Sequence, residues 1–223
     1  MKKRIWMRAW VMAAAVLGAA ALGGCSQSET QGTASQDSGS QEKTSAADGQ
    51  QDLLAQIQEK GFVTIAMEGT WAPWTYHDEN DNLVGYDVEV GQRIAQGLGV
   101  EADFIEGEWD GLLAGLDSGR YDMMINGVDI TEEREKAYDF SEPYAYNRMA
   151  VIVRGDYDEI QTMEDLAGKH TANTISSTYA ETAEQYGAEV TGVDDLNQTF
   201  ELLLSGRIDA TLNSEVTFYD YMK

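Results

Sequence analysis

Short β-rich runs alternate with amphipathic helical runs from residue 53 to the end of the chain, and this alternation restricts the possible folds. The expected strands cover 62–68, 101–106, 121–126, 148–155, 169–174, 188–193 and 207–213. The expected helices cover 53–61, 86–99, 109–119, 177–187, 195–206 and 214–223. Strands that alternate with helices in this way predict an α/β fold with a largely parallel sheet.

Two halves of this region resemble each other. The segments "LDSGRYDMMIN" (116–126) and "LLSGRIDATLN" (203–213) both run from a helix end through Ser-Gly-Arg into a strand. Two similar units predict two lobes with a ligand between them, and we assign the lobes to residues 53–147 and 148–223.

The position of the binding loops follows from the expected sheets. Open α/β sheets bind ligands beyond the carboxyl ends of their strands. The expected binding loops therefore follow four strand ends, at Glu68, Asn126, Thr174 and Asn213.

The first 24 residues have the pattern of a signal peptide. Basic residues occur within positions 2–8, a mostly apolar run covers 11–22, and "LGGC" ends at Cys25, the only cysteine in the chain. A short apolar run behind basic residues is typical of a secretory signal and not of a membrane-spanning helix. The motif resembles the lipobox of bacterial lipoproteins, which predicts that Cys25 becomes the lipidated N-terminus. Ordinary secretion with an unpaired thiol is the alternative.

Residues 25–52 consist mainly of Ser, Gln, Gly, Thr and Asp and contain almost no residue that could form a core. This composition predicts a flexible tether. The folded part would then lie outside the cytoplasm, at the cell surface or in the periplasm, with a lipid anchor at the cell membrane.

The formal net charge of −24 restricts the possible partners. We expect no nucleic acid partner, because phosphate binding needs a clustered positive field. His77 and His170 lie far apart in the sequence without nearby ligand-type residues, so we expect no metal site. We also expect no other cofactor, because no glycine loop of the phosphate-binding kind is present.

Five motifs together resemble one known family. They are "EGTWAPW" (68–74), "GYDVEVGQRIAQGL" (85–98), "EWDGLLAGLDSGRYDMMI" (108–125), "ITEEREKAYDFSEPY" (130–144) and "SGRIDATLN" (205–213). In order and spacing they resemble the polar amino-acid solute-binding proteins of ABC importers, called family 3 binding proteins. The resemblance covers residues 53–223, and the segment "ANTISSTYAETAEQYGAEVTGV" (172–193) is most similar to the cystine-binding branch.

The resemblance implies a two-lobed clamp of the type II periplasmic-binding-protein kind, which closes on a free amino acid by a hinge motion. The closed form would be presented to an ABC permease in the membrane. We therefore expect a binding protein without enzymatic turnover, acting as a monomer.

Family members usually continue beyond the strand at 207–213, whereas this sequence stops at Lys223. The resemblance thus implies a truncated copy, in which the second lobe and the return to the first lobe are incomplete. We expect some uncovered apolar surface and a lower stability than that of an intact relative.

Three residues are candidates for binding the ligand carboxylate. Arg134 corresponds to the carboxylate-binding arginine of the family, and its planar guanidinium can hold two carboxylate oxygens at once. Ser177 and Thr178 stand at the start of an expected helix, where backbone N–H groups lack partners and suit an anion. A surface ion pair is the alternative for Arg134, and a simple N-cap is the alternative for the serine.

Four residues are candidates for the ligand ammonium. Relatives commonly have Asp just after the last strand, where this chain has Ser214 and then Glu215. Asp129 stands where relatives usually carry Thr or Ser, so one of Asp129 and Glu215 should supply the negative charge that a buried ammonium needs. By resemblance, the Gly127 carbonyl also accepts from the ammonium. Capping of the helix after Thr131 is the alternative role of Asp129.

Three residues are candidates for contacting the ligand side chain. Trp71 and Trp109 match family positions whose rings enclose the ligand, and flat aromatic faces also attract cations. Glu68 matches an acidic position that can meet a distal positive group. Core packing is the alternative for the tryptophans, and a solvated strand end is the alternative for Glu68.

These candidates favour a polar or cationic amino acid. Cystine is the best match, and arginine, lysine and glutamine stay as alternatives. Two other functions use the same fold: a cyclohexadienyl-dehydratase-like enzyme, in which one of the acidic candidates would act as a general acid, and a ligand-sensing module.

Overall fold

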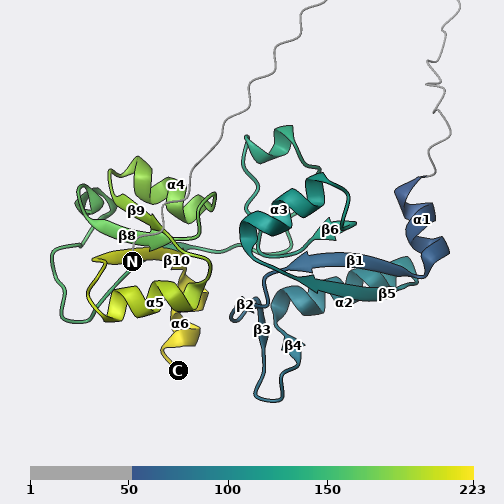
Figure 1. The fold of residues 1–223 in the computed structure, drawn as a ribbon, viewed down its shortest axis with the longest axis horizontal. Coiled ribbons are helices and arrows are strands. Elements are labelled where there is room, and N and C mark those ends of the chain that lie inside the picture. Colours follow the sequence, from purple (N-terminus) through teal and green to yellow (C-terminus); the bar gives the residue numbers. More distant parts are fainter. Residues whose placement is uncertain (1–51) are drawn as a thin grey trace, which may run out of the picture. The chain divides into compact units, whose positions relative to one another are not determined.

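The computed structural model describes residues 52–223 (Figure 1). The predicted signal peptide, the predicted lipidation site at Cys25 and nearly all of the tether lie outside the described residues. The helices are α1 (Leu53–Lys60), α2 (Tyr86–Leu98), α3 (Trp109–Asp117), α4 (Thr178–Gln185), α5 (Leu196–Leu204) and α6 (Glu215–Tyr221), with 3₁₀ helices η1 (Arg134–Lys136) and η2 (Met163–Leu166). The strands are β1 (Phe62–Met67), β2 (Thr70–Trp71), β3 (Thr75–His77), β4 (Leu83–Val84), β5 (Glu101–Glu106), β6 (Met123–Met124), β7 (Met149–Val153), β8 (His170–Asn173), β9 (Glu189–Gly192) and β10 (Ala210–Ser214).

The predicted alternation of strands and helices is confirmed, with differences at the ends of elements. The strand expected at 121–126 is only two residues long as β6, although the backbone N–H groups of Asp122 and Ile125 extend the pairing to β1. The strand expected at 207–213 begins at Ala210, because the chain is still turning out of α5 over residues 205–209.

The first sheet has the strand order β5-β1-β6 and is parallel throughout (Figure 1). Val63, Ile65 and Met67 of β1 belong to one core cluster, to which α1 and α2 also contribute. Ala66 belongs to a second cluster with Leu112 of α3. Because helices cover both faces of the sheet, β1 is an almost continuous apolar run, as is typical of buried parallel strands.

The second sheet has the strand order β7-β10-β8-β9. Strands β10, β8 and β9 are parallel to one another, whereas β7 runs antiparallel to β10. All five residues of β10 are buried. Phe200 of α5 packs in one core cluster of this sheet, and Ala183 of α4 packs in another. Strand β10 is thus a buried inner strand that lies between β7 and β8.

A small antiparallel sheet, β2-β3-β4, was not predicted. Its strands have two or three residues each, which is too short for a periodic pattern to reveal them. Thr70 lies opposite Tyr76, and Trp71 lies opposite Thr75. This pairing fixes the segment that follows β1 and keeps Trp71 at 8% exposure.

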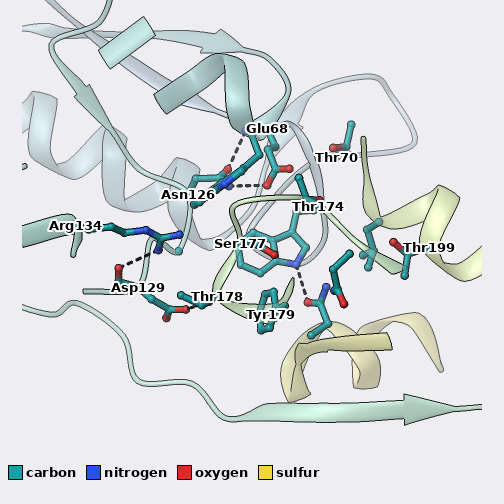
Figure 2. A pocket seen from close by; sticks show the side chains of 16 residues that line it. Glu68, Thr70, Asn126, Asp129, Arg134, Thr174, Ser177, Thr178, Tyr179 and Thr199 are labelled. Carbon is teal, nitrogen blue, oxygen red and sulfur yellow. Dashed lines mark hydrogen bonds between the residues drawn. The ribbon is translucent and has the colours of Figure 1, made fainter. Parts of the chain in front are cut away.

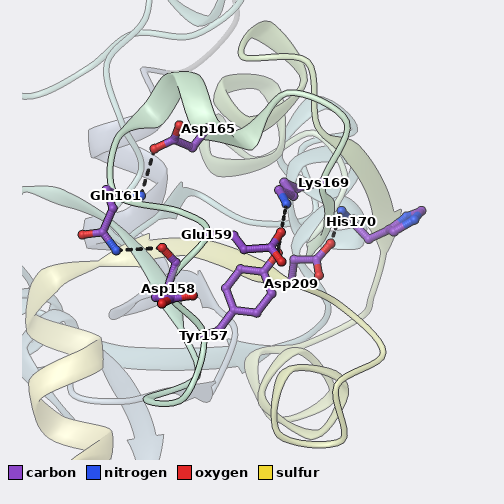
Figure 3. Close-up of polar contacts among 8 residues, drawn as sticks. All are labelled: Tyr157, Asp158, Glu159, Gln161, Asp165, Lys169, His170 and Asp209. Atoms are coloured by element: carbon purple, nitrogen blue, oxygen red, sulfur yellow. Dashed lines mark hydrogen bonds and ion pairs between the residues drawn. The ribbon is translucent and has the colours of Figure 1, made fainter.

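The segment between β7 and β8 is fixed by polar contacts (Figure 3). Asp165 accepts hydrogen bonds from the backbone N–H groups of Gln161 and Thr162, at 2.9 and 2.8 Å, and thereby closes the start of η2. The Lys169 Nζ lies 2.5 Å from the Glu159 carboxylate. These contacts tie the segment to the start of η2 and to Lys169, the residue that precedes β8.

No helix within residues 52–223 is long and apolar enough to cross a membrane. The same part of the chain holds no group of three or more His, Cys, Asp or Glu side chains arranged to bind a metal ion.

Candidate functional site

A pocket of about 590 Å³, including its open mouth, lies at the carboxyl ends of strands from the two larger sheets, β5-β1-β6 and β7-β10-β8-β9 (Figure 2). Residues before β7 that line it are Glu68, Thr70, Trp71, Trp109, Asn126, Gly127, Asp129 and Arg134. Residues after β7 that line it are Asn173, Thr174, Ser177, Thr178, Tyr179, Leu196, Thr199 and Asn213. The four strand ends selected from the sequence all contribute to this lining.

Arg134 is half-buried and enters the pocket from η1 (Figure 2). Its Nη1 donates to the carbonyl oxygen of Asp129 at 3.1 Å, and its Nη2 donates to the carbonyl oxygen of Ser176 at 3.1 Å. Its guanidinium carbon lies 5.2 Å from the centre of the Trp109 ring. The hydroxyl of Thr131 accepts from the Arg134 backbone N–H at 3.2 Å and so closes the turn that leads into η1.

No acidic side chain in residues 52–223 forms a salt bridge with Arg134. A guanidinium has five N–H donors. In Arg134, hydrogen bonds to the backbone oxygens of Asp129 and Ser176 use two of them. Donors of Arg134 therefore remain for a further acceptor in the pocket.

Helix α4 begins at the pocket. Ser177 is its N-cap, and the Ser177 hydroxyl accepts from the backbone N–H of Ala180 at 3.1 Å. The Thr178 hydroxyl donates to the Asp129 carboxylate at 2.5 Å (Figure 2). The first N–H groups of a helix lack partners within the helix and favour negative charge. Arg134 and the start of α4 thus form a positive region next to the Asp129 carboxylate.

The two predicted tryptophans are both buried pocket residues, at 8% exposure for Trp71 and 7% for Trp109. Trp71 Nε1 donates to Asn213 Oδ1 at 3.2 Å, and Trp109 Nε1 donates to the Ser176 hydroxyl at 3.1 Å. Each indole therefore joins a segment before β7 to a segment after it.

Glu68 and Asn126 form a closed pair at the pocket (Figure 2). The Glu68 backbone N–H donates to Asn126 Oδ1 at 2.8 Å, and Asn126 Nδ2 donates to the Glu68 carboxylate at 2.6 Å. Burial raises the pKa of Glu68, while the hydrogen bond from Asn126 opposes this effect. A nearby cation would favour the ionised form of Glu68.

Ser214 and Glu215 do not line the pocket, so the structure does not bring them to the ammonium position that the sequence suggested. Ser214 is fully buried and is the N-cap of α6, where its hydroxyl accepts from the backbone N–H of Thr217. Glu215 forms an ion pair with Arg148, with 2.7 Å between Nε and Oε2. Both side chains have partners that hold them away from the pocket.

Sequence reasoning named the loops but missed several polar side chains within them. Asn173 and Asn213 line the pocket, as do Tyr179 and Thr199. Asn213 Oδ1 accepts both from Trp71 Nε1 and from the Ser214 backbone N–H at 2.8 Å. Two donors on one atom identify it as the oxygen, so the amide Nδ2 is available as a donor. The sequence feature that could have identified Asn126, Asn173 and Asn213 as pocket residues is their position at the end of a strand.

A buried carboxyl lies behind the pocket wall. Asp87 of α2 is fully buried, and its Oδ1 accepts from the Tyr144 hydroxyl at 3.1 Å. The same hydroxyl accepts from the backbone N–H of Gly127 at 3.2 Å. Asp87 Oδ2 has no hydrogen-bond partner among the described residues. Burial raises the pKa of Asp87 to about 6, although the hydrogen bond from Tyr144 opposes it.

The sequence profile of the bacterial extracellular solute-binding proteins, family 3, matches residues 63–186. This match covers more than half of the chain, and the chain therefore belongs to this family.

Two relatives illustrate the similarity. The L-cystine-binding protein TcyA of Bacillus subtilis is 41% identical over 184 residues, which cover 82% of this chain and 68% of that protein. The L-cystine-binding protein TcyJ of Escherichia coli K12 is 38% identical over 176 residues, which cover 78% of this chain and 66% of that protein. The chain thus spans about two thirds of the length of these relatives.

Solved structures confirm the type II periplasmic-binding-protein fold. A mutant of ArgBP from T. maritima has a TM-score of 0.73 and 34% identity, with 77% of this chain and 76% of that chain covered. An ancestral amino acid-binding protein, described as a precursor of cyclohexadienyl dehydratase, has a TM-score of 0.73 and 27% identity, with 77% and 78% covered. The neighbour that is related to an enzyme is thus itself described as a binding protein.

Replacing Asp87 with Asn should change how stability depends on pH. The folded-state pKa of Asp87 is raised to about 6 from 3.8, so its stabilising contribution is present below about pH 4 and is lost as pH rises through about 6. The free energy of unfolding of Asp87→Asn relative to wild type should therefore rise by roughly 2 kcal/mol between about pH 4 and pH 7.5. Urea unfolding of both proteins at the two pH values measures this difference, and an equal gap at both would contradict it.

Proposed function

We propose that this chain binds a free amino acid in the pocket, outside the cytoplasm, and delivers it to an ABC permease in the membrane. The observation that carries the proposal is the Arg134 guanidinium, which lines the pocket without an acidic partner among residues 52–223. A guanidinium holds a carboxylate through two parallel hydrogen bonds. Relatives named as amino-acid-binding proteins of ABC transporters support the same assignment.

The charges in the pocket fit both ends of an amino acid. Arg134 and the N-terminus of α4, with Ser177 and Thr178, form the positive region for the α-carboxylate. Asp129 stands beside them and supplies the negative charge for the α-ammonium, with the Gly127 carbonyl as a further acceptor. A zwitterion satisfies both regions, whereas a simple anion or cation would leave one charge without a partner.

We favour cystine as the ligand, with arginine, lysine and glutamine as alternatives. Besides the amino-acid-binding groups, the pocket offers the Glu68 carboxylate and the Asn213 Nδ2 donor. The second half of cystine carries an ammonium and a carboxylate, and these suit an acid and an N–H donor respectively. Two similar relatives are named for cystine. The indole faces of Trp71 and Trp109 suit the apolar middle of such a ligand.

Replacing Arg134 with Ala should weaken binding by at least about a hundredfold, because the ligand carboxylate would lose its paired cation at a cost of roughly 3 kcal/mol or more. A thermal-shift screen of the twenty amino acids and cystine would select the ligand. Calorimetry with that ligand then measures the dissociation constant. Arg148→Ala is the matched control, since Arg148 pairs with Glu215 outside the pocket. Unchanged affinity in Arg134→Ala would contradict the proposal.

Asp129→Asn should weaken binding about tenfold or more, because an amide cannot balance the ligand ammonium. Glu215→Gln should leave the affinity nearly unchanged, because Glu215 is paired with Arg148 and does not line the pocket. Calorimetry on the two isosteric variants compares the positions directly. The reverse order of effects would assign the ammonium to Glu215.

We further propose that the protein is anchored through a lipid on Cys25, on the basis of the signal-like residues 1–24. In a bacterial host, the wild type should fractionate with membranes, and Cys25→Ser should be released as a soluble protein because it has no acyl chains. Immunoblots of the two fractions test this proposal. Equal membrane association of both proteins would mean that another element holds the chain.

A further inference from the structure

Ser176 has an unusual backbone conformation at the edge of the pocket. It lies in the four-residue turn 174–177 between β8 and α4, which is closed by a hydrogen bond from the Ser177 N–H to the Thr174 carbonyl at 3.3 Å. The φ angle of Ser176 is +61°. This left-handed region is rarely adopted by residues other than Gly, Asn and Asp, and glycine is the usual choice at such a turn position.

Ser176 makes three hydrogen bonds to segments that precede β7. Its hydroxyl accepts from Trp109 Nε1 at 3.1 Å and donates to the Asp110 carboxylate. Its carbonyl accepts from Arg134 Nη2 at 3.1 Å. Trp109 and Arg134 are both lining residues of the pocket, and the guanidinium carbon lies 5.2 Å from the indole ring centre. Ser176 thus contacts both members of this pair.

The side chain of Ser176 is what distinguishes this turn from the same turn with glycine. Glycine would adopt the φ of +61° without strain, and its carbonyl could still accept from Arg134. Only the hydroxyl can bond to Trp109 and Asp110 together, because a hydroxyl donates and accepts at the same time. Backbone strain that is retained with specific contacts points to a functional role.

We propose that Ser176 is a positioning residue that holds Trp109 and Arg134 in their binding geometry and fastens the turn 174–177 across the pocket. This inference rests on the proposed amino-acid binding. In this role Ser176 lowers the rate of ligand release, because the hydroxyl bonds must break before the turn moves away from α3.

Two substitutions at one position separate the hydroxyl from the backbone. Ser176→Ala keeps the strained φ and loses the hydroxyl, whereas Ser176→Gly relieves the strain and loses the hydroxyl. Both should weaken binding of the selected amino acid about tenfold, which is the size expected for two lost hydrogen bonds. The melting temperature of Ser176→Gly should nevertheless lie about 2–4 °C above that of Ser176→Ala. A purely structural serine would not give a Ser176→Gly variant that binds as weakly as Ser176→Ala and yet has a higher melting temperature.

Two further variants serve as controls. Ser205→Ala removes an exposed hydroxyl that bonds only to the Leu202 carbonyl in the described chain, and it should leave affinity unchanged. Asp110→Ala removes one partner of the Ser176 hydroxyl, so its effect should be smaller than that of Ser176→Ala. Asp110→Ala combined with Ser176→Ala should bind as weakly as Ser176→Ala alone, because both act through the same hydroxyl.

A measurement without ligand distinguishes this inference from the proposed function. Spin labels on cysteines introduced at the exposed positions Arg93 and Glu184, in a full chain carrying Cys25→Ser, report the distance between α2 and α4. We expect both Ser176 variants to show a broader or longer distance distribution than the parent chain.

The outcomes separate cleanly. Wild-type affinity and unchanged distances in both Ser176 variants would overturn the positioning role, while amino-acid binding would stand. If the wild type binds no amino acid, the proposed function fails, and the distances alone decide whether Ser176 fastens the turn. A Ser176→Gly variant that binds more weakly than wild type and melts no higher than Ser176→Ala would also overturn the inference, since it would indicate a merely structural serine.

Discussion

The pocket contains one cation, Arg134, that is held by backbone oxygens instead of carboxylates. Arg134 donates to the carbonyls of Asp129 and Ser176, which belong to the segments after β6 and after β8. Carbonyl acceptors fix the position of the guanidinium but leave its positive charge unbalanced, whereas a salt bridge to an acidic side chain would have neutralised that charge. The same side chain therefore links two segments of the protein and remains attractive to a carboxylate.

The second constraint is the polarity of the parallel strands. Carboxyl ends of parallel strands meet at one edge of a sheet, and the residues that follow them must satisfy backbone groups that leave the sheet. Asn126 and Asn213 do this with one side-chain atom each while the rest of the amide borders the pocket. Asn213 in turn accepts a hydrogen bond from Trp71, so the end of strand β10 fixes the position of this pocket indole.

The acidity of the chain and the chemistry of the pocket act on different length scales. A net charge of −24 disfavours anionic partners at a distance, but exposed charges are screened within about 10 Å at ordinary salt concentrations. Inside the pocket, Arg134 and the start of α4 stand beside Asp129, and this local balance suits a zwitterion. The family match places the chain among extracellular solute-binding proteins, where such a pocket is expected.

The sequence by itself determined the alternation of the longer strands and helices, the largely parallel arrangement of these strands and the loops that border the pocket. These depend on hydrophobic periodicity and on strand polarity, which are local properties of the chain. The resemblance of their motifs to those of the family, and not a local periodic pattern, singled out Arg134, Asp129 and the two pocket tryptophans. The short strands β2 to β4 were not predicted, since two or three residues are too few to show an alternating hydrophobic pattern.

Only the tertiary structure decided which polar residues meet. Ser214 and Glu215 stand at the end of β10, as a binding residue should, yet one caps α6 and the other pairs with Arg148. Conversely, Ser176 contacts Trp109 and Arg134 from a distant part of the sequence. Hydrogen bonds over 40 or more residues depend on how two sheets face a shared pocket, and no local pattern encodes this arrangement.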